Sequence, residues 1–378
     1  MDYPFSFDGP VTGKYFVGRR DDVQLLQNLL FSGESVAVYG EPGVGCKSLA
    51  LQALSEGRLK LQQFIPAEVD LTRARTLEDV LVSFASGLIR ACGTTVEEFR
   101  SIAAEALQGT HLVFDEERFS SCGEVVSPSW MLDEIDVEKV LALPSYVASR
   151  RHTRVVVMVK EFSSVLFAED PDLVLKPLEK VIARQDRSCP FVFMGSAYGA
   201  MRYIFDKKRY FYHTVERLTP SPLRPEDISD YVLMALRNSG RVIERDLVER
   251  VAQMLRCNPR YVNHLFFIVD AIAKGFISQK SIEDALGVLL GVYSPSFFAK
   301  MADLTNFQVS LLRAICDGNE KLSASGVIDK YSLNSSANVK RLKDALEKKE
   351  VVWFDAEDIP HVTDPLFEHW LRKVYFAG

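Results

Sequence analysis

Short apolar runs alternate with segments of helical periodicity over the first 218 residues. The short runs have the length of buried strands, whereas the longer segments repeat apolar residues three and four positions apart, as one face of a helix does. This alternation predicts right-handed crossovers and a parallel sheet covered on both faces, an α/β fold. Residues 108–135 break the pattern and predict an irregular insertion. The expected strands are 35–39, 63–69, 154–159 and 191–194, and the expected helices are 21–30, 49–55, 76–92, 96–107, 137–149 and 173–184.

The pattern changes at Thr219. A proline-rich junction, TPSPLRPEDI, is followed by helical segments to about Leu290, which predicts a small helical domain. A second junction, GVYSPSFFAK, leads to three more helical segments and then two short strands joined by a turn at DAEDIP. Three helices followed by a two-stranded wing predict a winged helix. The expected domains are residues 1–218, 219–291 and 292–378, and the three helical segments are 306–317, 324–331 and 335–349.

The composition is that of a globular chain. The 378 residues are 47% hydrophobic and 25% charged, with a formal net charge of −6. These values exclude disordered and fibrous classes and argue against a protein that coats nucleic acid through bulk charge. No apolar run approaches the roughly 18–20 residues of a membrane-spanning helix. The start, MDYPFSFDGPVTGKYF, lacks a basic region followed by an apolar one, so we do not expect it to act as a signal peptide. Six scattered cysteines suit neither a zinc site nor a disulfide framework. We therefore expect a reduced, cytoplasmic location without membrane contact.

A glycine-rich turn, GEPGVGCKS, joins the expected strand 35–39 to the helix after it. This order places backbone N–H groups at a helix N-terminus, which attracts phosphate. The P-loop pattern GxxxxGK[ST] is met by the glycines but not by the next two residues, because Cys46 stands at the lysine position and Lys47 at the hydroxyl position. The residues expected to bind the nucleotide here are Gly40, Gly43, Val44, Gly45, Cys46, Lys47 and Ser48.

Two interpretations of this substitution stay open. A local bulge could let Lys47 and Ser48 act one position late, as the phosphate-binding lysine and the Mg²⁺-binding hydroxyl. Alternatively, the loop cradles an anion but lacks normal Mg²⁺ binding and charge stabilisation. Within the second interpretation, GEPGVG could also be only a tight turn.

The expected strand 154–159 is followed by Lys160 and Glu161. In P-loop enzymes, such a strand ends in an Asp that holds Mg²⁺ and an acidic residue that activates the attacking water. Glu161 is therefore the candidate catalytic base, but Lys160 cannot ligate a metal. Lys160 either places a positive charge near the phosphates or is a solvated residue at a strand end. The substitutions in the glycine-rich turn and at Lys160 thus both remove groups that normally bind Mg²⁺ or the phosphates.

These motifs resemble the archaeal-type P-loop ATPases of the AAA+/STAND group, which also occur in Bacteroidetes-like bacteria. The likeness covers nearly the whole chain: the opening YPFSFDGPVTGKYFVGRRDDVQLL, GEPGVGCKSLA as Walker A, VVVMVKEF as Walker B, FVFMGSAYGAM as sensor 1, CNPRYVNHL as sensor 2, and LTNFQVSLLRAI with HVTDPLFEHWLRK as the winged helix. The resemblance implies a P-loop AAA+ parallel-sheet core with an all-helical lid and a C-terminal winged helix. It also implies that Phe16, Val17 and Gly18 lie near the adenine, that Ser196 faces the γ-phosphate, and that Arg260 reaches the phosphates.

The third helix of a DNA-binding winged helix enters the major groove. Here that helix is SSANVKRLKDALEKKE, which has a small surplus of positive charge that includes Lys340, Arg341 and Lys343. Winged helices also serve as protein-interaction modules. Contact with DNA and contact with a protein partner are therefore both open for this face.

The sequence thus predicts a protein that binds ATP or ADP and acts as a nucleotide-dependent switch with weak or absent hydrolysis. The nucleotide is expected against the backbone of residues 43–47, with Arg260 contributed by the lid. A protein partner is expected as well. The alternatives are a pseudo-ATPase adaptor that works without nucleotide and a DNA-binding winged-helix regulator.

Overall fold

The computed structural model describes residues 4–60, 63–184, 187–206 and 210–377, and its contacts divide the chain into two units. The core unit comprises Arg20–Gly40 and Cys46–Pro220. The lid–wing unit comprises Met1–Arg19, Glu41–Gly45 and Ser221–Gly378. Residues 41–45 of the phosphate loop therefore pack with the second unit, whereas the helix that follows them packs with the first.

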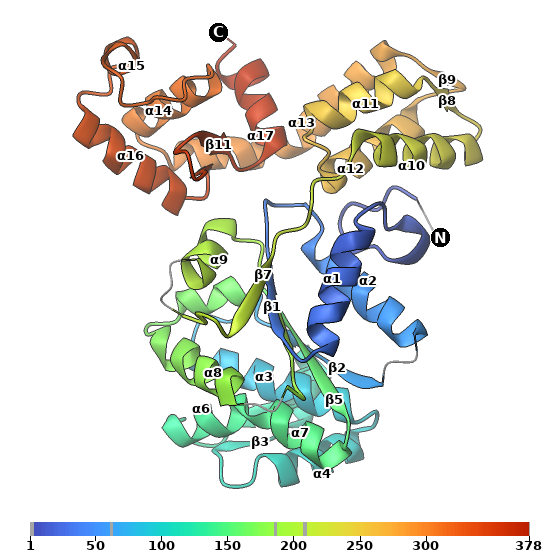
Figure 1. The fold of residues 1–378 in the computed structure, drawn as a ribbon, viewed down its shortest axis with the longest axis vertical. Coiled ribbons are helices and arrows are strands. Elements are labelled where there is room, and N and C mark those ends of the chain that lie inside the picture. The colour runs from blue at the N-terminus through green and yellow to red at the C-terminus, as the bar shows by residue number, and fades with distance from the viewer. Residues whose placement is uncertain (1–3, 61–62, 185–186, 207–209, 378) are drawn as a thin grey trace. The chain divides into compact units, whose positions relative to one another are not determined.

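The core unit is built on a five-stranded sheet with the order β2-β5-β6-β1-β7, in which every pairing is parallel (Figure 1). Glu68 pairs with Met158, and Val157 pairs with Phe191. The predicted α/β parallel sheet and its four expected strands are confirmed. A fifth strand, β7, lies at the sheet edge and was not expected. The strands are β1 (Ser35–Val38), β2 (Phe64–Asp70), β5 (Arg154–Lys160), β6 (Phe191–Met194) and β7 (Val215–Leu218).

Helices cover both faces of this sheet (Figure 1). Val155, Val157 and Val159 belong to the hydrophobic cluster that includes α3, α6 and α8. Val156 and Met158 are equally buried on the opposite face, because side chains alternate along a strand. The helices are α1 (Arg20–Phe31), α2 (Cys46–Leu59), α3 (Leu77–Cys92), α4 (Val96–Ala106), α6 (Glu134–Leu141), α7 (Leu143–Arg151), α8 (Asp172–Arg184) and α9 (Tyr198–Phe205), with a 3₁₀ turn, η2 (Phe162–Phe167).

The insertion at residues 108–135 is more ordered than its sequence predicts. Strands β3 (Leu112–Phe114) and β4 (Val126–Pro128) pair antiparallel, and the short helix α5 (Glu116–Cys122) lies between them in sequence. The backbone N–H of Val125 donates to the buried Ser86 hydroxyl of α3 at 3.0 Å. The expectation of an irregular segment is therefore corrected, because side-chain contacts with α3 supply order that local periodicity does not signal.

The lid portion of the second unit is helical apart from one short strand pair. Its helices are amphipathic, and their apolar faces form one cluster that also includes Phe5. Two-residue strands pair in parallel beside them, a detail that the expected all-helical lid lacks. The elements are η1 (Gly13–Tyr15), α10 (Pro225–Asn238), β8 (Val242–Ile243), α11 (Arg245–Met254), α12 (Pro259–Ile272) and β9 (Phe276–Ile277).

The C-terminal portion has three helices followed by a two-stranded antiparallel wing, as predicted. Val352 pairs with Val362 across the wing. The buried Trp370 packs against Phe297 and Phe367, with ring centroids 5.6 and 5.9 Å away. The elements are α14 (Asn306–Cys316), α15 (Ser325–Lys330), α16 (Ser336–Lys348), β10 (Val352–Phe354), β11 (Pro360–Val362), α17 (Pro365–Trp370) and one π-helical turn, η3 (Leu371–Tyr375).

One long helix, α13 (Gln279–Ala302), joins the lid to the winged helix. It runs through GVYSPSFFAK, so the junction expected there is corrected to helix. Among the described residues, α13 alone is long and apolar enough to cross a membrane by length and composition, with 22% of its apolar window buried. The expectation that no segment reaches this threshold was wrong, because glycines and Pro295 divide the apolar run. Core helices pass the same test, so α13 is weak evidence for a membrane.

Candidate functional site

The phosphate loop has the backbone that its glycines predict. Gly43 and Gly45 adopt left-handed φ angles of +81° and +93°, where residues with a Cβ are strained. Helix α2 then begins at Cys46. The first backbone N–H groups of a helix have no partner within it and carry a partial positive charge. The predicted glycine turn is confirmed, but the helix begins three residues earlier than the predicted residue 49, so Cys46, Lys47 and Ser48 belong to its first turn.

Helix α12 packs its first residues against this loop within the lid–wing unit. The Asn258 amide donates to the Pro42 carbonyl at 2.8 Å, while its Oδ1 caps α12 by accepting from the backbone N–H of Arg260 at 3.1 Å. A Cβ added at Gly43 would lie 2.9 Å from Asn258 Oδ1 and 3.0 Å from Arg260 Cβ. Arg260 therefore lies against the loop, and its expected role at the phosphates stays a prediction. Its guanidinium opposes the rise in the pKa of Tyr293 that burial causes.

The loop also contacts the winged helix. Glu41 Oε1 accepts a hydrogen bond from Trp353 Nε1 of β10 at 2.9 Å and lies 3.8 Å from Arg256 Nη1. Burial raises the pKa of Glu41, although the Arg256 charge and the Trp353 hydrogen bond act in the opposite direction. Arg256 in turn donates to the Val362 carbonyl of β11 at 2.8 Å and contacts Glu368. The phosphate loop is thus joined to the wing by polar contacts.

The segment expected near the adenine lies against the start of α10. A Cβ added at Gly18, whose φ is +63°, would lie 3.0 Å from Leu223 and 3.3 Å from Asp227. Val17 is partly buried against the lid–wing cluster. The Arg19 guanidinium contacts the Val44 carbonyl and donates from Nε to the Ser221 carbonyl at 2.6 Å. Residues 16–19 and the phosphate loop are thereby connected, and the adenine role of Phe16, Val17 and Gly18 stays a prediction.

In the core unit, the end of β5 brings the two unexpected lysines together. Lys160 is the last residue of β5, its side chain is only 12% exposed, and its ammonium contacts the Glu68 carboxylate. Burial, and then the positive charge of the neighbouring Lys47 ammonium, lower the pKa of Lys160 to about 8. Lys160 is therefore a packed residue beside Lys47 and not a freely solvated strand end.

Glu161 and Ser196 meet at the ends of the neighbouring strands β5 and β6. Glu161 adopts a left-handed φ of +50° and begins η2. Its Oε2 accepts from the Ser196 backbone N–H at 3.0 Å and from the Ser196 hydroxyl at 2.7 Å. One oxygen of the Glu161 carboxylate is therefore already hydrogen-bonded to Ser196 and is not available to accept a proton from an attacking water. The catalytic role of Glu161 and the γ-phosphate role of Ser196 stay predictions.

The basic face expected on α16 is only partly available. Lys340 and Arg341 are exposed. Lys343 contacts Asp358 and lies 4.2 Å from the centre of the Phe354 ring, with its side chain 17% exposed. Lys343 is therefore engaged within the winged helix itself.

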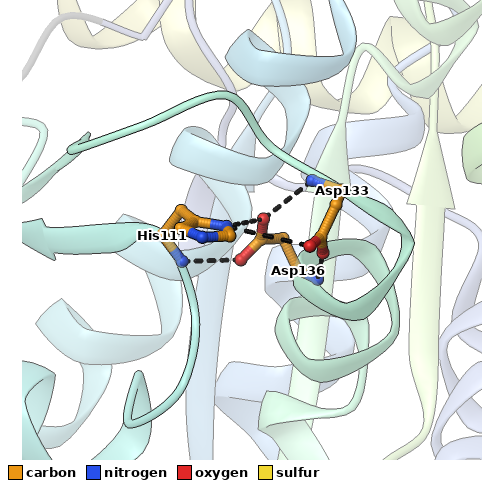
Figure 2. A group of neighbouring side chains, drawn as sticks. All are labelled: His111, Asp133 and Asp136. Atoms are coloured by element: carbon orange, nitrogen blue, oxygen red, sulfur yellow. Dashed lines mark hydrogen bonds and ion pairs between the residues drawn. The ribbon is translucent and has the colours of Figure 1, made fainter.

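A histidine and two aspartates gather in the insertion (Figure 2). His111, Asp133 and Asp136 place ligand atoms within 4.8 Å of one another. However, the Asp136 carboxylate already accepts from the backbone N–H groups of His111 at 2.7 Å and Asp133 at 2.8 Å, and it lies 2.9 Å from His111 Nδ1. Asp133 caps the start of α6. Capping explains this group without a metal.

Comparisons with known proteins agree with the architecture. A family model described as a probable winged helix domain matches residues 295–373. A search of curated proteins finds no match. Among solved structures, a Walker-type ATPase of Pyrococcus abyssi is 13% identical with a TM-score of 0.68, and the match covers 98% of this chain and 99% of that one.

Two proteins of Aeropyrum pernix also match along nearly their whole lengths. ORC2, solved as ADPNP–ADP complexes, is 14% identical with a TM-score of 0.60, covering 99% of this chain and 98% of that chain. ORC1, solved in complex with DNA, is 12% identical with a TM-score of 0.51, covering 100% of this chain and 97% of that chain. Such likeness at low identity shows the fold. The chain therefore shares the fold of this Walker-type ATPase and of the two ORC proteins, and it ends in a winged helix domain.

Proposed function

We propose that the chain binds ATP or ADP at residues 40–48 and acts as a nucleotide-dependent switch. Gly43 and Gly45 shape a turn that leads into the N-terminus of α2, the kind of backbone that binds phosphate. The similar ORC2 protein was solved with adenine nucleotides. Arg260 packs against the same turn. These features support nucleotide binding as the function that the fold and the loop favour together.

Hydrolysis is weak or absent in this proposal. Cys46 supplies no positive charge where P-loop enzymes place a lysine, and Lys160 supplies no carboxylate for a metal. Glu161 is held by Ser196 through two hydrogen bonds. The groups that stabilise the transferring phosphate and activate water are thus missing or engaged, whereas the backbone that binds phosphate is kept.

The observation that carries the switch is the hydrogen bond between Glu41 and Trp353. Glu41 is the second residue of the phosphate loop, and Trp353 lies in the wing. A nucleotide that strains or breaks this bond by changing the loop conformation has its binding free energy coupled to the position of the wing. The ring of Trp353 also stacks on His361 of β11, with centroids 4.4 Å apart, so both strands of the wing are involved.

Calorimetric titration of the full chain with ATP and with a non-hydrolysable analogue tests the proposal. We expect one nucleotide per chain, similar affinities for the two ligands and little phosphate release. Absence of binding heat up to about 1 mM ligand would refute nucleotide binding, because a weaker site contributes less than roughly 4 kcal/mol. That result would favour the nucleotide-independent adaptor.

Restoring the altered positions tests weak hydrolysis. The triple variant Cys46→Lys, Lys47→Ser, Lys160→Asp should turn over ATP faster than the chain itself, because it regains the lysine, hydroxyl and carboxylate of the P-loop pattern. The matched control is the double variant that keeps Lys160. Equal turnover in the triple variant, the double variant and the unmodified chain would contradict this explanation of the weak activity.

DNA binding through α16 is the second candidate. Its support is the exposure of Lys340 and Arg341 on the third helix of the winged helix, together with the similar ORC1 protein that was solved with DNA. A gel-shift series at rising salt should show an affinity for DNA that falls with salt. The double variant Lys340→Ala, Arg341→Ala should reduce the slope of log affinity against log salt concentration by about 2, as expected for the loss of two phosphate contacts. A salt-independent shift, or no shift, would reject this candidate.

A further inference from the structure

The ends of α2 and β5 in the core unit place two ammonium groups where a P-loop protein places the donors for Mg²⁺. Lys47 lies in the first turn of α2, and Lys160 is the last residue of β5. In the P-loop pattern these two positions supply a hydroxyl and a carboxylate to the metal. Mg²⁺ requires oxygen ligands in near-octahedral geometry, and ammonium groups provide none.

Two carboxylates next to Lys160 already have partners. The Glu68 carboxylate contacts the Lys160 ammonium, and the Glu161 carboxylate accepts two hydrogen bonds from Ser196. A divalent cation placed here would meet two like charges and would have to compete for each carboxylate. Apart from the Ser48 hydroxyl one position later, the residues present therefore do not fit Mg²⁺.

We propose that Lys47 and Lys160 together take the place of Mg²⁺, so that the terminal phosphates of a nucleotide bind without a metal. This inference rests on the proposed nucleotide-binding function. Two ammonium groups carry the same charge as one Mg²⁺ and offer several N–H donors to phosphate oxygens.

The electrostatics of the pair favour this ligand class. The Lys160 side chain is largely buried, and the exposed Lys47 lies beside it. Two neighbouring ammonium groups repel each other, and an anion with at least two negative charges relieves that repulsion. Glu68, whose side chain is 47% exposed, provides only one such charge and only to Lys160. A polyphosphate would contact both ammonium groups and could displace Glu68 into solvent.

ATP binding to the full chain, measured by calorimetry in excess Mg²⁺ and again in excess EDTA, tests the inference. We expect the two dissociation constants to agree within about threefold. Binding that weakens by about tenfold or more in EDTA would overturn the metal-free site while leaving the proposed nucleotide binding intact. No binding in either buffer would overturn both.

Single substitutions assign the effect to the lysine pair. Lys47→Gln removes an exposed side chain, so folding should be unaffected, and metal-free ATP binding should weaken by about tenfold with the loss of one charge-assisted hydrogen bond. Lys160→Asp should make binding depend on Mg²⁺. The matched control is Lys180→Gln, an exposed lysine of α8, which should leave both dissociation constants unchanged. Unchanged metal-free affinity in Lys47→Gln would overturn the inference.

Discussion

Substituting Gly43 by alanine should destabilise the lid–wing unit. The φ of +81° costs alanine about 1–2 kcal/mol. The new Cβ would also lie 2.9 Å from Asn258 Oδ1. Asn258 cannot retreat easily, because its amide donates to Pro42 and its Oδ1 caps α12, and loss of such a cap costs about 1 kcal/mol. Alanine also stiffens the unfolded chain, which offsets about 0.5 kcal/mol. The net loss should be about 2 kcal/mol, the sum of these estimates.

Denaturation by urea, followed by tryptophan fluorescence, measures this loss. Trp353 and Trp370 both report on the lid–wing unit, whereas Trp130 of the core unit is 73% exposed and changes little. The matched control is Gly291→Ala, at an exposed position of α13 where a Cβ meets no atom within 4 Å. It should stabilise the unit by about 0.5–1 kcal/mol, because glycine is unfavourable inside a helix. A Gly43→Ala variant as stable as the unmodified chain would refute the clamping of the loop by α12.

Three further outcomes are expected. Trp353→Phe keeps an aromatic ring but removes the donor to Glu41, so the free energy of unfolding should fall by about 1–2 kcal/mol in urea titration; an unchanged value would show that this bond contributes nothing. Burial raises the pKa of Asp136, but hydrogen bonds from His111 and Asp133 outweigh it and lower the pKa. Its stabilisation is therefore complete above the ordinary aspartate pKa of about 4 and is lost as pH falls through the lowered value. Asp136→Asn should lose about 1–3 kcal/mol at neutral pH and flatten that acid dependence in urea titrations; a dependence identical to the unmodified chain would contradict it. Lys343→Ala should lower the melting temperature, since Lys343 contacts Asp358 and Phe354, whereas the exposed Lys340→Ala should not; equal melting temperatures would show that the Lys343 contacts are unimportant.

Most of the fold could be predicted from local sequence pattern. The four predicted strands, β1, β2, β5 and β6, are short runs rich in apolar residues. The winged helix was predicted from three segments of helical periodicity followed by two short strands and a turn. Strand β7 escaped prediction because it is short and lies at an edge, where Glu216 and Arg217 remain exposed. Helix α13 was divided in the prediction because Pro295 and two glycines interrupt its pattern. Packing of the surrounding elements decides such cases.

The candidate site could be predicted only where a sequence motif or the end of a strand marks its residues. Gly43 and Gly45 follow from the loop motif, and Glu161 and Ser196 follow from strands that end at the same sheet edge. The contact between Glu41 and Trp353 joins residues 312 positions apart, and neither residue belongs to a motif that signals the other. The contact between Lys160 and Glu68 could not be predicted either, because it depends on the register in which β2 pairs with β5.

Hydrogen–deuterium exchange of the wing, with and without ADP, tests the switch most directly. Nucleotide binding should change the exchange of residues 352–362 in the unmodified chain, because Glu41 of the phosphate loop is bonded to Trp353. The change should be lost in Trp353→Phe and kept in Trp130→Phe, whose tryptophan is exposed in the core unit. ADP-dependent exchange confined to α2 and β5, with residues 352–362 unaltered, would contradict the coupling of the nucleotide to the winged helix.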